Sequence, residues 1–212
     1  MKDLLIEASI QTIVMVLISS LLAFIIGMPL ALILVLTQKD GLMENKGIYN
    51  LISGIINLLR SVPFIILMLI LFPLSRLILG TSIGTKPAII PLAISASPFL
   101  ARLIEGNINE VDKGKADAAL SMGAGKVEII TMQIKEALPA IISSTTNTTV
   151  NLIGYSAMAG SIGGGGLGDA AIRYGVYIGD NKVLWASVVI LVIFVQVIQL
   201  TGTGLASAIN KK

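Results

Sequence analysis

The sequence predicts an all-helical integral membrane protein, with one transmembrane domain over residues 1–212, and two observations support that prediction. First, 55% of the residues are hydrophobic and only 13% are charged, against roughly 45–50% and 25% in soluble domains. Second, nearly uncharged stretches of about 20 residues, the length of a membrane-crossing helix, recur along the chain. A chain of 212 residues has room for about five such spans and for no second soluble domain.

The first predicted span covers residues 10–36, within an uncharged run from Ala8 to Gln38. Gly27 and Pro29 lie inside it, and transmembrane helices tolerate both residue types. The segment before it lacks the basic region and cleavage site of a signal peptide, so we expect this span to be retained.

The second predicted span, residues 50–75, contains Arg60 within one helix, because the apolar stretch on either side alone is too short to cross. Pro63 follows and can bend the helix. A cation inside a span costs at least ~2.5–3.5 kcal/mol unless it reaches water or a partner. We therefore expect Arg60 in the cytoplasmic half of the membrane, where it either pairs with an acid such as Glu105 or acts in transport.

The third and fifth predicted spans differ in clarity. The third, residues 87–104, is short and is interrupted by Pro91 and Pro98. The fifth, residues 183–208, is apolar throughout. Only the fifth therefore has an uninterrupted apolar pattern of the length that a membrane helix needs.

The fourth predicted span, residues 138–162, is uncharged but carries eight Ser, Thr and Asn side chains between Ser143 and Asn151. A helix this polar is unfavourable against lipid, so we expect protein or a water-filled pathway around it. Asn147 and Asn151 are candidate pathway residues for this reason.

Five spans put the two termini on opposite sides of the membrane, and the distribution of basic residues gives the orientation. One side collects eight basic residues: Lys39, Lys46, Lys113, Lys115, Lys126, Lys135, Lys211 and Lys212. The other side collects five: Lys2, Arg76, Lys86, Arg173 and Lys182. The excess predicts an outside N-terminus and a cytoplasmic C-terminus.

Several kinds of chemistry are excluded by the residues present. The chain has no cysteine and no histidine, which removes disulfides, Cys/His zinc sites and Ser–His or Cys–His nucleophiles. We predict no catalytic residue and no metal site. "GAGK" fails as a phosphate-binding loop, because Leu120 and Val127 occupy its required glycine and Ser/Thr positions. The net charge of +3 gives no indication of a nucleic-acid partner.

The glycine-rich segment "GGGGLG" formally fits a dinucleotide-binding pattern, but it follows a membrane helix rather than a strand. We interpret it as a flexible connection that can act as a hinge for an outer loop. The candidate hinge residues are Gly163, Gly164, Gly165, Gly166 and Gly168.

Residues 108–136 form a polar, charged island that reads as helix, glycine turn, helix. Four positions recur at i, i+3, i+4 and i+7: Ala116, Ala119, Leu120 and Gly123. A second stripe consists of Val127, Ile130, Ile134 and Leu138, and Pro139 is expected to start the next span. The island is either an amphipathic surface connector or a docking element whose small side chains, Ala118, Ala119 and Gly123, fit a partner's groove.

The pattern D-A-A-x-x-x-G, followed by "EALP", resembles the EAA loop of ATP-binding-cassette (ABC) importer permeases. The match covers Asp117, Ala118, Ala119 and Gly123. In that family the loop is a cytoplasmic coupling helix seated in a cleft of the ATPase subunit. This chain departs from the family pattern in having aspartate for glutamate. It also has Ile134 and Lys135 where a further Leu-Pro pair is frequent.

A narrower resemblance covers nearly the whole chain. "NLLRSVPFIILM", "GTSIG", "PFLAR" and "GYSAMAGSIGGGGLG" are similar to the permease subunit of methionine-uptake transporters. The resemblance implies a type I importer permease in the cytoplasmic membrane, built from two copies of this chain with two cytoplasmic ATPases that use ATP and Mg²⁺. It also implies an extracytoplasmic methionine-binding protein or lipoprotein, and transport of D- and L-methionine.

Two alternatives stay open. One is a permease of the same class for another small polar solute. The other is an ATP-independent secondary transporter. A transporter coupled to protons usually needs Asp, Glu or His inside the membrane. The five predicted span cores hold none of these, which favours the ATP-driven class.

The end of the fourth span is the candidate gate toward the outside. Tyr155 and Met158 are three residues apart and share one helix face, whereas Ser156 lies on another. Methionine is unbranched and adaptable, which suits a constriction that parts and reseals. Ordinary helix packing is the alternative interpretation of Met158.

Overall fold

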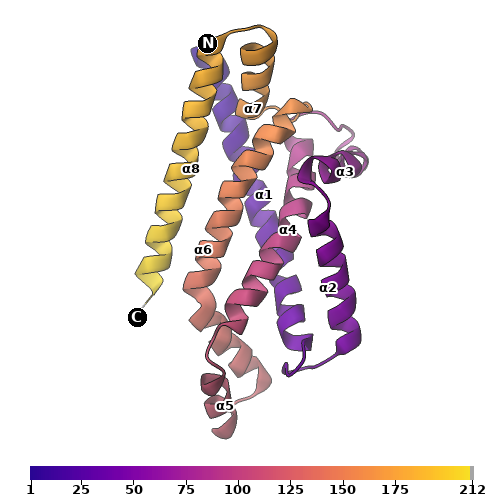
Figure 1. The fold of residues 1–212 in the computed structure, drawn as a ribbon, viewed down its shortest axis with the longest axis vertical. Helices are drawn as coiled ribbons and strands as arrows, with labels where there is room; N and C mark the ends of the chain where they lie inside the picture. Colours follow the sequence, from indigo (N-terminus) through magenta and orange to yellow (C-terminus); the bar gives the residue numbers. More distant parts are fainter. Residues whose placement is uncertain (211–212) are drawn as a thin grey trace.

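The computed structural model describes residues 1–210, and the regular structure in that part of the chain is helical, as predicted (Figure 1). The elements are α1 (Lys2–Thr37), α2 (Lys46–Ser61), α3 (Phe64–Leu79), α4 (Thr85–Asn109), α5 (Lys113–Ser121), α6 (Lys126–Ser161), α7 (Gly166–Ala170), the π-helix η1 (Ala171–Tyr177) and α8 (Asn181–Ile209). Lys211 and Lys212, used above to orient the chain, lie outside the described residues.

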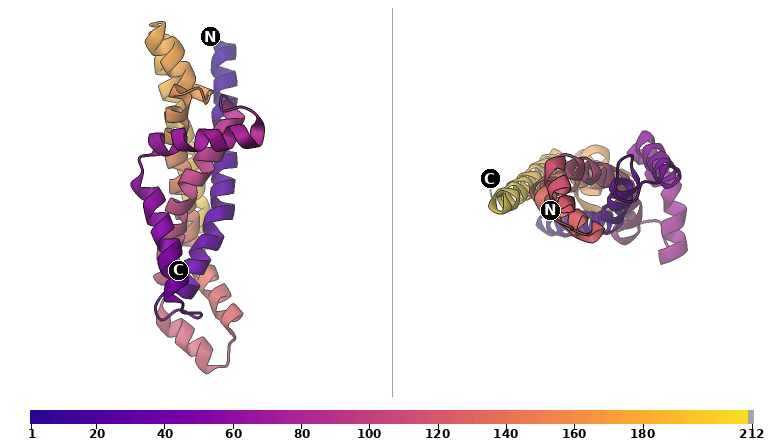
Figure 2. Two further views of the ribbon diagram at one scale, coloured as in Figure 1. Left: turned by 90° about the vertical axis from the view of Figure 1, so that its right-hand side faces the viewer. Right: turned by 90° about the horizontal axis from the view of Figure 1, so that it is seen from below.

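The long helices α1, α4, α6 and α8 run along the long axis of the molecule, with α2 beside them (Figure 1). α3 lies across this direction, as Figure 2 shows. The N-terminus and the end of α8 point toward opposite ends of the bundle, and α5 lies at the end that α8 approaches.

Three helices, α1, α4 and α8, are long and apolar enough to cross a membrane by themselves. α2 and α3 meet that criterion only together, as a broken pair. α6 has 36 residues, so it is about 54 Å long, but its polar run lowers its hydropathy. The protein is therefore a multi-pass membrane protein, and the count of five spans stays a prediction.

Small side chains bring α1 and α4 close together. Ala23, Gly27 and Ala31 recur every four residues on α1, and all three are buried. A Cβ atom added to Gly27 would lie 3.0 Å from the carbonyl oxygen of Ser97 on α4. Membrane helices use such faces because lipid leaves close van der Waals packing as a main attraction between them.

The third predicted span is longer and more regular than expected. α4 has 25 residues and continues through both Pro91 and Pro98, so the expectation of a twice-interrupted span over 87–104 is wrong. Each proline lacks an N–H and leaves free the carbonyl four residues earlier. Inside a membrane such a carbonyl needs another donor.

Serine hydroxyls supply those donors. The Ser75 hydroxyl, from α3, donates to the carbonyl oxygen of Pro87 at 2.9 Å. The Ser97 hydroxyl donates to the carbonyl oxygen of Ile94 at 3.1 Å. The helix therefore keeps its freed carbonyls paired, and α3 is attached to α4 by one of the two bonds.

The second predicted span is broken, so the expectation of one helix through Arg60 is wrong. α2 ends at Ser61, α3 starts at Phe64, and the helix direction bends by 110° between them. Pro63 cannot donate a backbone hydrogen bond, and it restricts the preceding residue to extended conformations. Val62 accordingly has φ −83° and ψ 128°. The proline produces a break rather than a bend.

The second helix of the polar island and the fourth predicted span are a single helix. α6 continues through Pro139, which starts no new element, contrary to expectation. One proline removes only one backbone hydrogen bond, and the turns on either side remain helical. The island is thereby connected directly to the polar run.

Candidate functional site

The predicted coupling segment is a helix–turn–helix at one extreme of the molecule (Figure 1). The Asp112 side chain caps α5 by accepting a hydrogen bond from the amide of Gly114 at 2.8 Å. Gly123 turns the chain with φ +85°, a conformation that favours glycine. Glu128 then caps α6 by accepting from the amide of Gly125 at 2.7 Å.

The residues predicted to contact an ATPase are accessible. Asp117, Ala118 and Gly123 are exposed, and Ala119 is half-buried. Beside them Met122 is 82% exposed, which is unfavourable for a large apolar side chain in water. The turn therefore has small residues and an uncovered apolar side chain on its surface, as a docking element would.

Most polar side chains of α6 are satisfied within the protein. Five hydroxyls donate to carbonyl oxygens four residues earlier in the same helix: Ser143, Thr145, Thr146, Thr148 and Thr149. The Ser144 hydroxyl accepts a hydrogen bond from the Asn107 amide of α4 at 2.8 Å. These groups need no water at membrane depth.

The asparagines differ from the hydroxyls. Asn147 and Asn151 are exposed, and neither side chain has a hydrogen-bond partner in the described part of the chain. Met158 follows on the same helix and is 49% exposed. Ser156 is buried, and its hydroxyl donates to the carbonyl oxygen of Ile153 at 2.7 Å. An exposed stripe of α6 thus carries Asn147, Asn151 and Met158.

The glycine-rich segment is packed against α1. The amide of Gly166 donates to Gln11 Oε1 at 2.8 Å, and the amide of Leu167 donates to Thr12 Oγ1 at 2.9 Å. Gly168 is buried, and a Cβ atom there would overlap the backbone of Ala157 on α6. Three of the candidate hinge residues have positive φ: Gly163, Gly165 and Gly166. The segment is a compact, well-packed turn in this structure.

Arg60 lies at the end of α2, next to the break. Its guanidinium carbon is 5.9 Å from the centre of the Phe99 ring, within reach of a cation–π attraction. Glu105 is not its partner, because that carboxylate pairs with Arg102 at 2.7 Å. Arg60 and Tyr155, predicted separately, line the same cavity.

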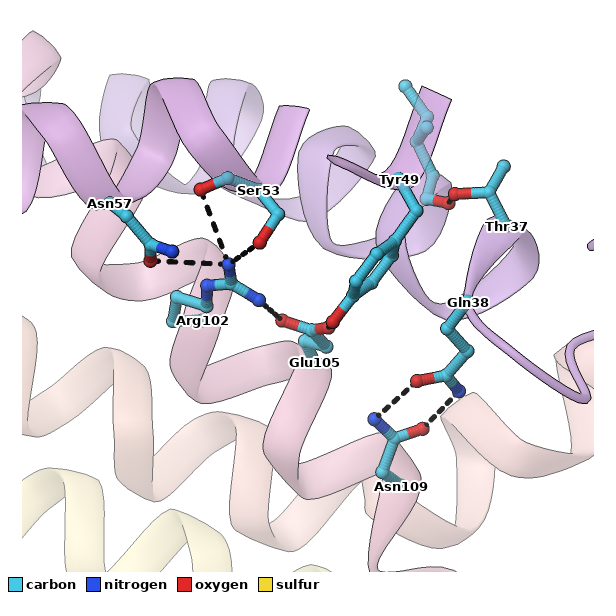
Figure 3. A network of polar contacts seen from close by, with 9 residues as sticks. Thr37, Gln38, Tyr49, Ser53, Asn57, Arg102, Glu105 and Asn109 are labelled. Atoms are coloured by element: carbon cyan, nitrogen blue, oxygen red, sulfur yellow. Dashed lines mark hydrogen bonds and ion pairs between the residues drawn. The ribbon is translucent and has the colours of Figure 1, made fainter. Parts of the chain in front are cut away.

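A polar network that the sequence did not reveal connects α2 to α4 (Figure 3). Arg102 donates to Glu105 at 2.7 Å, to Asn57 Oδ1 at 3.2 Å and to Ser53 Oγ. The Tyr49 hydroxyl donates to Glu105 Oε1 at 3.3 Å. The arginine–glutamate spacing of three residues on a helix is the signal that could have indicated this pair.

A second part of the same region joins α1 to α4. The side-chain amides of Gln38 and Asn109 exchange two hydrogen bonds, of 2.6 and 3.0 Å (Figure 3). Asn109 is the last residue of α4, and α5 starts four residues later. The end of α4 that precedes α5 is therefore hydrogen-bonded to Gln38 at the end of α1 and, through Arg102, to α2.

The predicted residues thus fall into four groups. The coupling residues lie at one end of the molecule, the glycine turn lies toward the other, and Arg60 and Tyr155 line one cavity. The fourth group is the exposed stripe of α6 with Asn147, Asn151 and Met158. Among residues 1–210, no cluster of three or more acidic, His or Cys side chains could hold a metal ion.

This architecture, apolar helices with an exposed helix–turn–helix at one end, is that of a membrane transport permease. The chain belongs to the family described as the binding-protein-dependent transport system inner membrane component, which it matches over residues 25–212.

Full-length relatives support the assignment. The chain is 47% identical, over 212 residues, to the probable D-methionine transport system permease protein MetI of Vibrio cholerae, covering 100% of this chain and 94% of that protein. It is 41% identical, over 181 residues, to the methionine import system permease protein MetP of Bacillus subtilis, covering 85% and 82%.

Solved structures agree with the fold. The chain is similar to the permease in inward-facing structures of the MetNI methionine ABC transporter, with a TM-score of 0.96 and 38% identity over 100% of this chain and 98% of that one. An amino acid ABC transporter is similar with a TM-score of 0.75 at 23% identity, covering 98% and 92%, which supports the fold alone.

Proposed function

We propose that this chain is the membrane-spanning permease subunit of an ATP-driven importer that carries D- and L-methionine across the cytoplasmic membrane by alternating access. The observation that carries the proposal is the likeness over the full chain, 47% identity to one methionine permease and a TM-score of 0.96 to another. Neither open alternative, another solute or an ATP-independent transporter, is favoured by these relatives.

Energy reaches the permease from outside the chain. Two cytoplasmic ATPase subunits bind ATP and Mg²⁺, and each receives one α5 in a cleft. The exposed Asp117, Ala118, Ala119 and Gly123 support this contact, because small side chains allow close approach. ATPase closure moves α5, and its connections to α4 and α6 tilt the spans around a fixed site.

A second copy of the chain completes the pathway. Asn147 and Asn151 support this part of the proposal, because exposed amides inside a membrane need a partner or water. Placed at a two-fold axis, their faces of α6 would line a polar passage between two permeases, to which Tyr155 is adjacent. Ser156 is buried on another side of α6, so it is not part of this face.

Met158 closes this passage toward the outside, and the glycine turn acts as its hinge. Met158 is exposed on the same stripe as the asparagines, and the turn of Gly163–Gly168 follows within one helical turn of the end of α6. The N-terminus lies outside and the C-terminus in the cytoplasm, so an extracytoplasmic binding protein or lipoprotein delivers methionine at the glycine end.

The test is uptake of labelled methionine by liposomes that hold the permease, its ATPase and the binding protein. ATP-dependent uptake that excess unlabelled methionine suppresses is expected. Uptake that proceeds without ATP would contradict the coupling, and uptake suppressed only by a different solute would contradict the substrate.

A further inference from the structure

A cavity of about 290 Å³ lies where α2 breaks from α3. Its walls come from both sides of the break, from the middle of α4 and from α6. Small-molecule sites generally measure ~300–1,000 Å³. This cavity is at the lower limit, which suits a ligand the size of one amino acid.

Two polar side chains of the cavity wall, Arg60 and Ser95, lack an ion-pair or hydrogen-bond partner in the described part of the chain. Arg60 has no salt bridge in the described part of the chain and contacts only the Phe99 ring face among charged or aromatic groups. The Ser95 hydroxyl on α4 is inaccessible and has no hydrogen-bond partner. A buried hydroxyl left unpaired costs free energy, and Arg60 is exposed without an ion-pair partner, so both groups are available for a ligand.

The depth of Arg60 makes its position informative. It lies 14 residues beyond Lys46, the first residue of α2, and therefore about 21 Å along the helix axis. A hydrocarbon core is ~30 Å thick, so a helix that starts at the cytoplasmic boundary of that core would carry this guanidinium past its middle, deeper than the cytoplasmic half expected from the sequence. A cation retained at such depth indicates a functional site.

The break itself adds anion-binding groups. α3 has 16 residues, and its first turn begins at the wall of the cavity with Phe64. The amides of Phe64 and Ile65 have no acceptor among residues 1–210, because the first bonds of the helix are donated by Ile66 and Leu67 to the Pro63 carbonyl oxygen. The N-terminal end of a broken membrane helix attracts an anionic group of a substrate.

Aromatic rings form the apolar part of the wall. Phe64 and Tyr155 stack with their centroids 4.2 Å apart and their planes within 8°. Phe99 lines the same cavity, with its ring under the Arg60 guanidinium. Thioether sulfur makes favourable contacts with aromatic rings, so an unbranched sulfur-containing side chain suits this surface.

The geometry points to a substrate-binding site within the permease, in which Arg60 and the start of α3 hold the carboxylate of a free amino acid. The Ser95 hydroxyl accepts a hydrogen bond from the ammonium group, and Phe64, Phe99 and Tyr155 contact the apolar side chain. The inference rests on the proposed function and places its substrate at one site. A fatty acid or phospholipid could supply the same anionic chemistry, so the test separates these sources.

The experiment uses the complete transporter in liposomes and photo-methionine, an analogue with a diazirine in its side chain. After illumination, mass spectrometry should find the label on peptides that contain Phe64, Phe99 or Tyr155, and excess methionine should remove it. Arg60→Gln should reduce this labelling by roughly tenfold or more, the effect of losing a hydrogen bond to a charged group. Arg76→Gln changes an arginine of α3 that does not line the cavity; it is the matched control and should label normally.

A second readout distinguishes direct contact from a structural role. Methioninol, which lacks the carboxylate, should compete roughly tenfold less well than methionine in the wild-type protein. In Arg60→Gln the difference between the two competitors should become smaller, because only the amides at the start of α3 remain to hold the carboxylate. Ser95→Ala, which removes only a hydroxyl, should weaken labelling while keeping the preference for methionine, and it covers the case in which Arg60→Gln does not fold.

Three outcomes would overturn the inference. The first is labelling elsewhere in the permease while methionine uptake is normal. The second is labelling of these peptides by a photoreactive phospholipid and not by photo-methionine, which would make the cavity a lipid site. The third is an unchanged preference for the carboxylate in Arg60→Gln. Absence of methionine uptake by the wild-type transporter would instead refute the proposed function and, with it, the substrate.

Discussion

Replacing Gly123 with tryptophan is expected to separate the permease from its ATPase while leaving the permease folded. Gly123 has φ +85°, and a Cβ atom added there would meet nothing within 4 Å. Within this chain, a larger side chain therefore costs free energy only through the left-handed backbone conformation, about 1–2 kcal/mol. Because the turn is exposed, that cost falls on a local segment rather than on the core.

Alanine at the same position separates strain from bulk. Gly123→Ala pays the same backbone penalty as Gly123→Trp but adds only a methyl group. The difference between the two variants therefore measures the space left by the docked partner. If α5 sits in a groove, tryptophan should weaken the association with the ATPase by at least about tenfold relative to alanine, or ~1.4 kcal/mol.

The assay compares three quantities for both variants: copurification of the ATPase, ATP-dependent uptake and the melting temperature of the purified permease. Copurification and uptake should fall together in Gly123→Trp at an unchanged melting temperature relative to Gly123→Ala. If the tryptophan variant forms a normal complex and transports normally, α5 is a surface connector and the docking argument fails.

Three further outcomes are expected. Single cysteines at position 158, replacing Met158 in this cysteine-free chain, should crosslink between subunits at rest and less with a non-hydrolysable ATP analogue; equal yields would make this segment scaffold. Gly202→Leu should destabilise the protein by ~1–3 kcal/mol, because a Cβ atom there overlaps the Thr146 side chain of α6. A Cβ atom at Gly204 meets nothing within 4 Å, so Gly204→Leu should not lower the melting temperature. Arg102→Met should cost ~3–5 kcal/mol by leaving Glu105 as an uncompensated charge with 7% side-chain exposure, and a second change, Glu105→Met, should recover most of it; additive losses in unfolding measurements would show that the pair does not interact.

Composition predicted the helices well where apolar residues dominate a segment. The first predicted span lies within α1, and the fifth lies within α8. The turn at Gly123 was also predictable, since the glycines interrupt a clear helical face. In these cases local preference and tertiary packing act in the same direction.

The prolines show where local reasoning stops. Pro63 breaks a helix completely, while Pro91, Pro98 and Pro139 lie inside continuous helices. At Pro91 continuity is supported by a donor from another helix, the Ser75 hydroxyl that pairs with the carbonyl left free on α4. Such a contact joins two helices and has no signature in the sequence around the proline itself.

The polar run of α6 shows the same limit for the candidate pathway. From the sequence alone, its serines, threonines and asparagines are all polar groups that need partners at membrane depth. A hydroxyl can donate a hydrogen bond to the carbonyl oxygen four residues earlier in its own helix, and Thr145 and Thr149 do so. The larger amides of Asn147 and Asn151 form no such bond in the described structure. The two asparagines, rather than the whole run, are therefore the residues that require water or a second subunit, and they fix which face of α6 should line the passage.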